Sequence, residues 1–388
     1  MPLSDRSPAS PSSPKTEAGG LRLLHLPNER RLTLRQKQVG PRKAFTWMQE
    51  TGVLERYDVF SYLWEAAQNG AAATRKRLRA LVDECRPDLI FWQHNTDFEV
   101  TTDFLRELKA ADSQPKLVYH DGDPYGRFIK RMPRPMRTIL PEADLVFLVG
   151  TGSFFDLARR YGAQTIRFAP HCFDTIRYGS SWTPTTSRPY DLVMIANYGG
   201  TRIPGRHLPG ARMRHRLVEA LTDEFGDRFA LYGKGWGDLP SARGRVPFLD
   251  QEKAIREAWV SVNWDHFDDV PFYHSDRLPI SLATGVPHVT CHHPGYDALC
   301  GDCESLFTVS TIDEAVDTVR YLLSLPPERL NEMGEQGRRF AFERFEANVV
   351  YGDIIRTCQQ LLFEDEAPSS TVLDSAKDDT KTEESAAV

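Results

Sequence analysis

Short apolar segments alternate with helical patterns along most of this sequence, and the alternation occurs in two successive rounds. Residues 88–92 (Asp-Leu-Ile-Phe-Trp) form an almost uninterrupted apolar run, which is typical of a strand in a parallel sheet covered on both faces. Strands that alternate with helices through short connections indicate βαβ units. The sequence therefore predicts an α/β fold with doubly wound, mainly parallel sheets. The expected strands are residues 21–26, 57–60, 88–92, 116–119, 144–149 and 165–168 in the first round, and 190–196, 229–233, 260–264, 287–290 and 305–309 in the second.

The chain of 388 residues is long enough for each round to form a domain of its own. Residues 177–190 carry Gly, Ser, Pro and Thr without a clear period, which is typical of a linker. Both ends of the chain are polar and rich in Ser, so we expect them to be disordered. The expected segments are a disordered tail over 1–20, a Rossmann-like domain over 21–170, a linker over 171–189, a second Rossmann-like domain over 190–340, a terminal helix over 341–363 and a disordered tail over 364–388.

The composition excludes several classes of protein. It is 40% hydrophobic and 26% charged, the profile of a soluble globular protein. The net charge of -6 implies no general attraction to nucleic acid. No apolar run approaches the ~20 residues that a membrane-spanning helix needs, and the first residues lack the apolar region of a secretory signal. We therefore expect a cytoplasmic protein with no transmembrane segment.

The six cysteines are too sparse for a disulfide framework. Cys300 and Cys303 form a C-x-x-C motif, and Cys291, His292 and His293 precede it. A single C-x-x-C is a weak indication of a metal site, because no second pair stands at zinc-finger spacing. We therefore expect reduced structural thiols and no metal site.

Residues 273–289 predict a loop, a short helix and a following strand. Ser275 or Asp276 is expected to cap the helix through a side-chain oxygen. Gly285 should end it, because glycine commonly follows the last helical residue. With Arg277 in its first turn, such a helix could hold a phosphate. An ordinary surface helix is the alternative.

Four loops that follow strands of the second round collect polar residues at one edge of the expected sheet. Lys234 could contact a phosphate as a point charge, and Trp236 could stack on a base or a sugar. The glycines around them lack the spacing of a P-loop. Each loop alone could be a flexible turn, but four at one edge favour a pocket for an anionic nucleotide. The loops are residues 197–202, 233–237, 263–266 and 272–277.

In the first round, His120 follows an expected strand and begins the segment His-Asp-Gly-Asp. A histidine there can act as a general acid or base, or it can hydrogen-bond a polar substrate. The alternative is an ordinary loop histidine. The segment Asp121-Gly122-Asp123 also matches the D-x-D motif that holds a metal-bound nucleotide sugar in single-domain transferases. That motif belongs to another fold and stands in the round opposite the expected nucleotide pocket, so we give it little weight.

Residues 190–355 resemble the nucleotide-sugar half of GT-B glycosyltransferases, group 1, and are most similar to the spore-maturation-like branch. The first round matches weakly, through His120 and through Pro-His-Cys-Phe-Asp at 170–174. The resemblance implies a GT-B fold of two domains facing across a cleft, with 21–170 as the acceptor domain, 190–340 as the nucleotide-sugar domain and the terminal helix crossing back. The segments that carry it are Leu-Tyr-Gly-Lys-Gly-Trp at 231–236, Ser-Asp-Arg-Leu at 275–278, Ala-Thr-Gly-Val-Pro at 283–287, Leu-Pro-Pro-Glu at 325–328, Gly334 and Gly-Arg-Arg at 337–339.

The resemblance also implies the residues of the site. In the family, a histidine after a first-domain strand faces the transferred sugar, and the donor diphosphate lies near the helix N-terminus. His120 and Asp121 are therefore the expected catalytic residues. The expected donor-binding residues are Asn197, Tyr198, Gly199, Arg202, Gly233, Lys234, Gly235, Trp236, His274, Ser275, Asp276 and Arg277.

The sequence departs from the family at one pair of positions. Retaining members usually carry Glu-x7-Glu across the donor-binding helix. An alignment on Gly285 puts Phe272 and Ile280 at those two places. In this branch Asp276 and Arg277 are expected to take over their role.

The sequence as a whole predicts a glycosyltransferase that moves a sugar from a nucleotide-diphosphate donor to an unidentified acceptor. The resemblance implies a retaining, metal-independent reaction, with no cofactor apart from the donor, a UDP- or GDP-sugar. The acceptor could be a glycan, a lipid, a protein or a small molecule. A catalytically silent nucleotide-binding scaffold and a sugar-nucleotide epimerase of the same fold are the alternatives.

Overall fold

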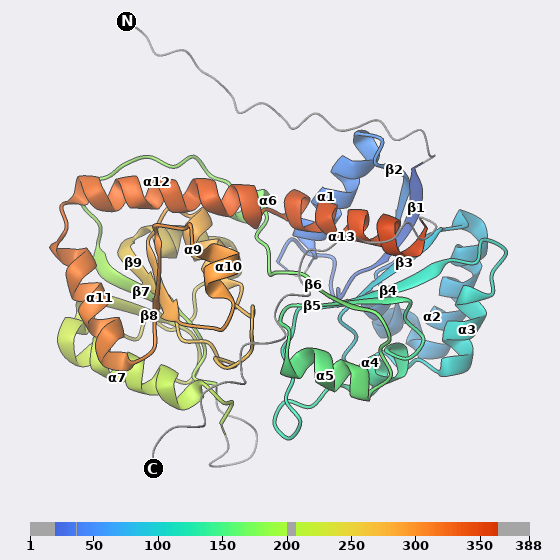
Figure 1. Cartoon of the computed structure of the whole chain (residues 1–388), viewed down its shortest axis with the longest axis horizontal. Helices are drawn as coiled ribbons and strands as arrows, with labels where there is room; N and C mark the ends of the chain where they lie inside the picture. The colour runs from blue at the N-terminus through green and yellow to red at the C-terminus, as the bar shows by residue number, and fades with distance from the viewer. Residues whose placement is uncertain (1–19, 36, 200–206, 364–388) are drawn as a thin grey trace, which may run out of the picture.

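The computed structural model describes residues 20–35, 37–199 and 207–363, and these form two lobes that lie side by side (Figure 1). The first lobe holds a six-stranded sheet in the order β2-β1-β3-β4-β5-β6, and the second a five-stranded sheet in the order β11-β10-β9-β7-β8. Neighbouring strands pair in parallel throughout. The strands are β1 Leu21–Leu26, β2 Leu54–Val59, β3 Leu89–Gln93, β4 Lys116–Asp121, β5 Leu145–Leu148, β6 Ile166–Phe168, β7 Tyr190–Ile195, β8 Phe229–Tyr232, β9 Ala258–Val262, β10 His288–Cys291 and β11 Leu306–Val309.

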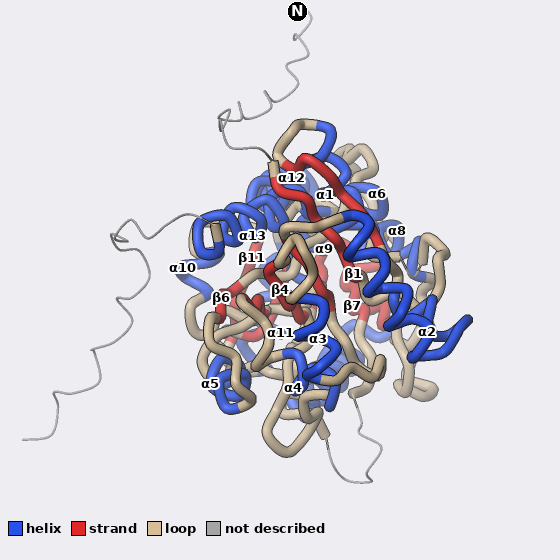
Figure 2. Tube along the Cα trace, turned by 90° about the vertical axis from the view of Figure 1, so that its right-hand side faces the viewer, coloured by secondary structure: helices blue, strands red, loops and turns tan. Residues whose placement is uncertain are grey.

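Helices connect the strands of both sheets, and in the first lobe they lie on both sides of the sheet (Figure 2). This arrangement confirms the predicted α/β class with two doubly wound sheets. The helices are α1 Val39–Glu50, α2 Tyr62–Cys85, α3 Thr102–Lys109, α4 Arg134–Ile139, α5 Ser153–Arg160, α6 Thr175–Tyr178, α7 Ala211–Phe225, α8 Gln251–Arg256, α9 Arg277–Ala283, α10 Tyr296–Cys300, α11 Ile312–Ser324, α12 Pro327–Arg344 and α13 Ala347–Leu362.

Strand β3 shows why an uninterrupted apolar run suits this fold. All five of its residues are buried. Ile90 and Trp92 belong to the core cluster on one face of the sheet, and Leu89 and Phe91 belong to the cluster on the other. Successive side chains of a strand point to opposite faces, so a strand covered on both sides must be apolar at every position.

The terminal helical segment is divided in two. Helix α12 runs along the second lobe, and α13 packs against the core of the first lobe through Tyr351 and Ile354 (Figure 1). The break at Phe345 and Glu346 pairs with the segment after β6: the Phe173 N–H donates to the Phe345 carbonyl (3.0 Å), and the Ala347 N–H donates to the Phe173 carbonyl (2.9 Å). The chain therefore passes between the lobes at two adjacent segments that are hydrogen-bonded to each other.

Helix α9 has seven residues. The expected cap is absent: Asp276 stands at the N-cap but makes no side-chain cap hydrogen bond, because its carboxylate pairs with Arg277 at 2.9 Å. The turn after the helix contacts α12 closely, where a Cβ on Gly334 would lie 2.2 Å from the Gly285 carbonyl oxygen. Glycine at 334 therefore sets how closely α12 approaches α9.

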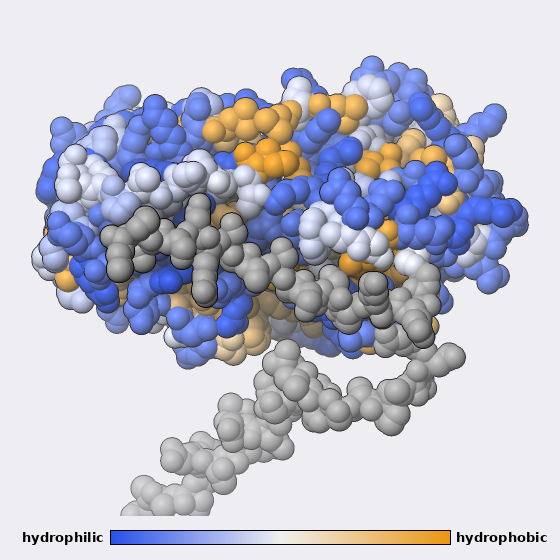
Figure 3. All heavy atoms as spheres, turned by 90° about the horizontal axis from the view of Figure 1, so that it is seen from above, coloured by the Kyte–Doolittle hydropathy of each residue, from blue (hydrophilic) through white to orange (hydrophobic). Residues whose placement is uncertain are grey.

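All six cysteines are free, as predicted. Within the described part of the chain, no helix combines the length and the apolar character that crossing a bilayer requires. The face along which α12 and α13 run is largely hydrophilic, and its hydrophobic atoms gather in a few patches (Figure 3).

Candidate functional site

Two cavities of about 320 Å³ each lie where the carboxyl edges of the two sheets face each other. We call them the first-lobe cavity and the second-lobe cavity, after the lobe that supplies most of their lining. Gly122, Asp123 and His171 line both. The two cavities therefore adjoin, and a ligand that extends through one can reach the other.

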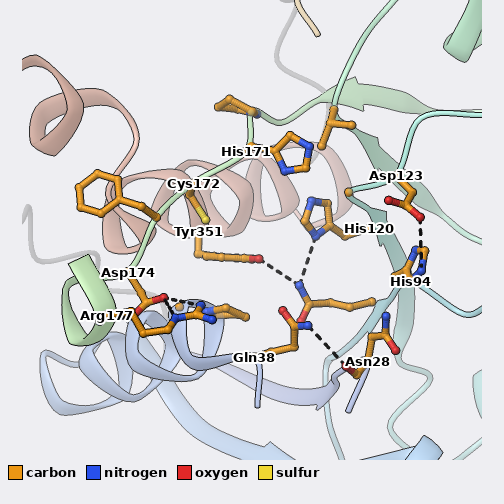
Figure 4. Close-up of a pocket in the computed structure, with 17 residues that line it drawn as sticks. Asn28, Gln38, His94, His120, Asp123, His171, Cys172, Asp174, Arg177 and Tyr351 are labelled. Carbon is orange, nitrogen blue, oxygen red and sulfur yellow. Dashed lines mark hydrogen bonds and ion pairs between the residues drawn. The ribbon is translucent and has the colours of Figure 1, made fainter. Parts of the chain in front are cut away.

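His120 lines the first-lobe cavity from the end of β4 (Figure 4). The Gln93 side chain donates from Nε2 to the Tyr351 hydroxyl (3.0 Å) and to His120 Nδ1 (3.3 Å). Because Nδ1 accepts, this network assigns the ring proton of His120 to Nε2. That Nε2 is buried and has no partner among the described residues. Burial lowers the pKa of His120 to about 4, so at neutral pH the ring is uncharged and offers a hydrogen-bond donor to a ligand.

His94, which follows β3, lines the same cavity in a different charge state. Burial disfavours its cation, but the Asp121 carboxylate, 2.8 Å from Nδ1, raises the pKa of His94 to about 9. Asp121 is fully buried and also accepts from the Tyr119 hydroxyl (2.8 Å) and the Asp123 N–H (2.9 Å). Asp121 lines neither cavity, so of the two expected catalytic residues only His120 can touch a ligand there.

Asp123 lies at the junction of the two cavities, although we give its D-x-D motif little weight because that motif belongs to another fold. Its side chain is 45% exposed. One carboxylate oxygen lies 3.8 Å from His94 Nε2 and 3.3 Å from Lys130 Nζ. Asp123 is therefore the carboxylate that both cavities share.

Cationic side chains gather at the second-lobe cavity. Arg277 donates from Nε to the Ile195 carbonyl (2.7 Å), which holds the side chain at the end of β7. Arg214 comes from α7 and donates to the Trp264 carbonyl (2.7 Å). Burial lowers the pKa of Arg214 to about 10, so it remains charged at neutral pH. With Lys130 this cavity has three positively charged side chains, and the carboxylates of Asp123, Asp265 and Asp276 line it as well.

Two further polar atoms of this cavity are free to bind a ligand. The Asn263 side-chain oxygen and His266 Nε2 are both buried, and neither has a hydrogen-bond partner in the part of the chain that the structure describes. Burying a polar group without a partner costs about 1–3 kcal/mol. A polar ligand would therefore gain affinity by satisfying them.

The expected donor-binding residues divide into four groups. Trp236 is buried, and its indole N–H donates to the Ala196 carbonyl (2.7 Å), so it packs between the ends of β7 and β8 and does not stack on a ligand. His274 is buried behind the second-lobe cavity. The second-lobe cavity is lined by four of the expected residues: Asn197, Ser275, Asp276 and Arg277. Five more lie beside the cavity without lining it: Tyr198, Gly199, Gly233, Lys234 and Gly235. Arg202 lies outside the described residues.

Neither residue at the Glu-x7-Glu positions lines a cavity. Ile280 is buried in the core of the second lobe. The Phe272 ring lies against Phe168, with the ring centroids 5.7 Å apart. The carboxylates that line the second-lobe cavity are those of Asp123, Asp265 and Asp276.

Asp265, Cys291 and His293 bring their ligand-type atoms within 4.8 Å of one another. All three side chains are buried, and the Asp265 carboxylate already accepts from the Asn263 side chain (2.7 Å) and the Ser275 N–H (3.2 Å). His293 Nε2 lies 3.3 Å from the same carboxylate. These contacts fit a hydrogen-bonded network that holds the Ser275 loop in place.

Comparisons with known proteins concern the second lobe and the fold of the whole chain. Residues 209–355 match the family model described as "Glycosyl transferase-like". No curated protein sequence matches the chain. Among solved structures, the chain is similar to HepE from Anabaena in complex with UDP, at 13% identity over 88% of this chain and 100% of that one, with a TM-score of 0.54. It is also similar to a glycosyltransferase from Rickettsia africae, at 8% identity over 90% and 100% of the two chains, with a TM-score of 0.57.

These similarities support the GT-B fold over nearly the whole chain. The family match covers most of the second lobe, and the structural similarities cover the fold of both lobes.

Proposed function

We propose that this protein transfers a sugar from a nucleoside diphosphate, with UDP as the nucleotide, to an acceptor hydroxyl. The observation that carries the proposal is the pair of adjoining cavities. Arg214, Arg277 and Lys130 line the second-lobe cavity beside three carboxylates, and the first-lobe cavity is lined by three histidines, His94, His120 and His171, beside other polar and charged groups. HepE, which has a similar fold, was crystallised with UDP and with UDP-glucose.

The second-lobe cavity would hold the donor diphosphate. When the bond between the sugar C1 and the phosphate oxygen breaks, negative charge develops on the departing diphosphate. Arg277 and Arg214 are already held in place by backbone carbonyls, so they can stabilise this charge without reorganising. Protein cations would thereby serve where a divalent metal acts in other transferases, and we propose a metal-independent reaction.

The transferred sugar would lie at the junction of the cavities, beside Gly122 and His171, with the acceptor in the first-lobe cavity. His120 would donate its Nε2 proton to a sugar or acceptor oxygen and would not act as a base, because its acceptor nitrogen is already bonded to Gln93. We propose retention of the anomeric configuration, as the family resemblance implies. The acceptor oxygen then forms its bond to C1 on the face that the phosphate leaves, and its proton passes to the departing phosphate oxygen.

The test is a panel of UDP- and GDP-sugars incubated with candidate acceptors, with nucleotide release and product formation measured in the presence of EDTA. Turnover that survives EDTA, with a product of retained configuration by ¹H NMR coupling constants, is the expected result. An inverted product would instead make Asp123 the base that deprotonates the acceptor.

Two other outcomes would replace the proposal. Binding of nucleotide without turnover in any acceptor mixture would favour a scaffold, the reading that the missing Glu-x7-Glu carboxylates support. Inversion of the configuration at a carbon of the donor sugar, without transfer to an acceptor, would indicate an epimerase.

A further inference from the structure

The first-lobe cavity continues into a third hollow, also of about 320 Å³, that is strongly basic. We call it the basic hollow. Asn28, Gln38 and Arg177 line both spaces. In Figure 4 these three residues lie together on the side of His120 that faces away from His171. A ligand that extends from His120 away from the donor would therefore enter the basic hollow. Its lining consists of Asn28, Arg30, Arg35, Lys37, Gln38, Arg177 and Phe248.

The loop that supplies most of these cations is anchored at both ends by one buried residue. Glu29 is fully buried and accepts from the Gln38 N–H (2.7 Å), from Arg42 Nε (2.8 Å) and from the Ser61 hydroxyl (2.7 Å). Because Glu29 and Gln38 stand at the two ends of the basic stretch, this carboxylate closes the loop. Arg30, Arg35 and Lys37 are thereby held at the rim of the first-lobe cavity.

Arg177 forms the wall between the two spaces. Its guanidinium pairs with Asp174 and lies over the Phe248 ring, 4.6 Å from the ring centroid. The stacked and paired geometry holds the guanidinium in a fixed orientation, which suits recognition of a planar or tetrahedral oxyanion.

The positive charges of the hollow are only partly neutralised. Arg30 pairs with Asp97 and Arg177 with Asp174, whereas Arg35 and Lys37 form no ion pair with any described residue. The chain as a whole is negative, at -6, so this local excess of positive charge does not follow from its composition. Such a concave cationic site focuses its potential on an anionic ligand.

We infer that the acceptor is a sugar that carries an anionic group, either a phosphate or a carboxylate. Its reacting hydroxyl lies near His120 in the first-lobe cavity, and its anionic group is bound in the basic hollow by Arg35, Lys37 and Arg177. The identification of the bound molecule as the acceptor rests on the proposed function. The binding of an anion in the basic hollow can be tested without turnover.

The test is calorimetric titration of the protein saturated with UDP, which occupies the second-lobe cavity. The probes are a set of hexoses, the corresponding hexose 6-phosphates and the corresponding hexuronic acids. We expect the best anionic probe to bind at least tenfold more tightly than its neutral parent, and its affinity to fall as salt is raised. The phosphates and the uronic acids form separate arms, so the tighter class identifies the group.

The double variant Arg35→Ala/Lys37→Ala should lose this preference while binding UDP as the wild type does. Arg31→Ala is the matched control, because Arg31 is exposed in the same loop and does not line the hollow. Neutral hexoses that bind as tightly as their anionic counterparts, or equal losses in the double variant and the control, would overturn the inference. Failure of UDP to bind would instead count against the proposed function, and the anion preference could still be measured on the protein without UDP.

Discussion

The charge states of the two histidines in the first-lobe cavity are set by their neighbours. His120 is kept neutral by burial and is oriented by the Gln93 amide, whereas His94 is kept cationic by the carboxylate of Asp121. One cavity thus offers a neutral donor and a charged donor within the same lobe. Asp121 acts through His94 and is a positioning residue.

Replacing Asp121 with Asn tests this assignment. Without the Asp121 carboxylate, burial lowers the pKa of His94 and the more distant Asp123 carboxylate offsets this only in part, so the pKa should fall well below 9. An NMR titration of the histidine ring protons measures the change. Asp123→Asn is the control and should lower the pKa less, because that carboxylate lies 3.8 Å from the ring. A His94 pKa that stays near 9 in Asp121→Asn would refute the pairing.

The sequence could predict site residues where they follow a predicted strand or begin a predicted helix. Asn197 follows a predicted strand and Arg277 lies in the first turn of a predicted helix at the same edge of the sheet. The structure brings both residues to one cavity. Arg214 was missed because it lies inside a helix, and it reaches the site only through its contact with the Trp264 carbonyl, 50 residues away in sequence. Tyr351 was missed for the same reason, since α13 must first pack on the other lobe.

At the scale of elements, the alternation of apolar and helical segments predicts the parallel sheets well, because buried strands need apolar residues on both faces. The terminal helix is less predictable. The apolar anchors continue through residues 328–362, but the backbone breaks at Phe345, where pairing with Phe173 replaces the helical hydrogen bonds. The expected domain boundary at 341 falls inside α12, which continues to Arg344.

Gly334 is expected to control the packing of α12 on α9. In Gly334→Ala the new Cβ would lie 2.2 Å from the Gly285 carbonyl oxygen, so the helix must shift. We expect a loss of about 1–3 kcal/mol in the free energy of unfolding, measured by chemical denaturation.

Gly352→Ala is the matched control in the neighbouring helix α13. Its Cβ would meet only the Met48 side chain, at 3.9 Å, and alanine raises helix propensity. This variant should be as stable as the wild type or up to about 1 kcal/mol more stable. Equal losses in the two variants would show that close packing at Gly334 is not the cause.

At the scale of the whole molecule, buried neutral histidines make stability depend on pH. Burial lowers the pKa of His25, His266 and His274 to about 3, and that of His120 and His288 to about 4. Below pH ~6.5 the unfolded chain binds protons at these residues and the folded chain does not, so stability falls as pH falls. Each such residue contributes roughly 1.4 kcal/mol per pH unit between its two pKa values. His94 has the opposite effect on the pH dependence. Its contribution to the stability of the folded chain is present below pH 6.5 and is lost as pH rises through about 9.

Denaturant unfolding at pH 7.5, 6.5 and 5.5 should therefore show a progressive loss of stability before the carboxylates titrate. His288→Gln should reduce the change in the free energy of unfolding with pH by the contribution of one histidine, whatever its effect on the free energy of unfolding at pH 7.5. A free energy of unfolding that stays constant from pH 7 to pH 5 would contradict the buried, neutral state of these rings.

The proposed function requires that the second-lobe cavity binds a nucleoside diphosphate through its cations. The most direct measurement is a calorimetric titration of UDP into the wild type and into Arg277→Ala, with Arg329→Ala, an exposed arginine of α12, as the control. We expect saturable binding with one site per chain that weakens at least tenfold in Arg277→Ala and is unchanged in Arg329→Ala. No binding of UDP, or the same affinity in Arg277→Ala as in the wild type, would contradict it.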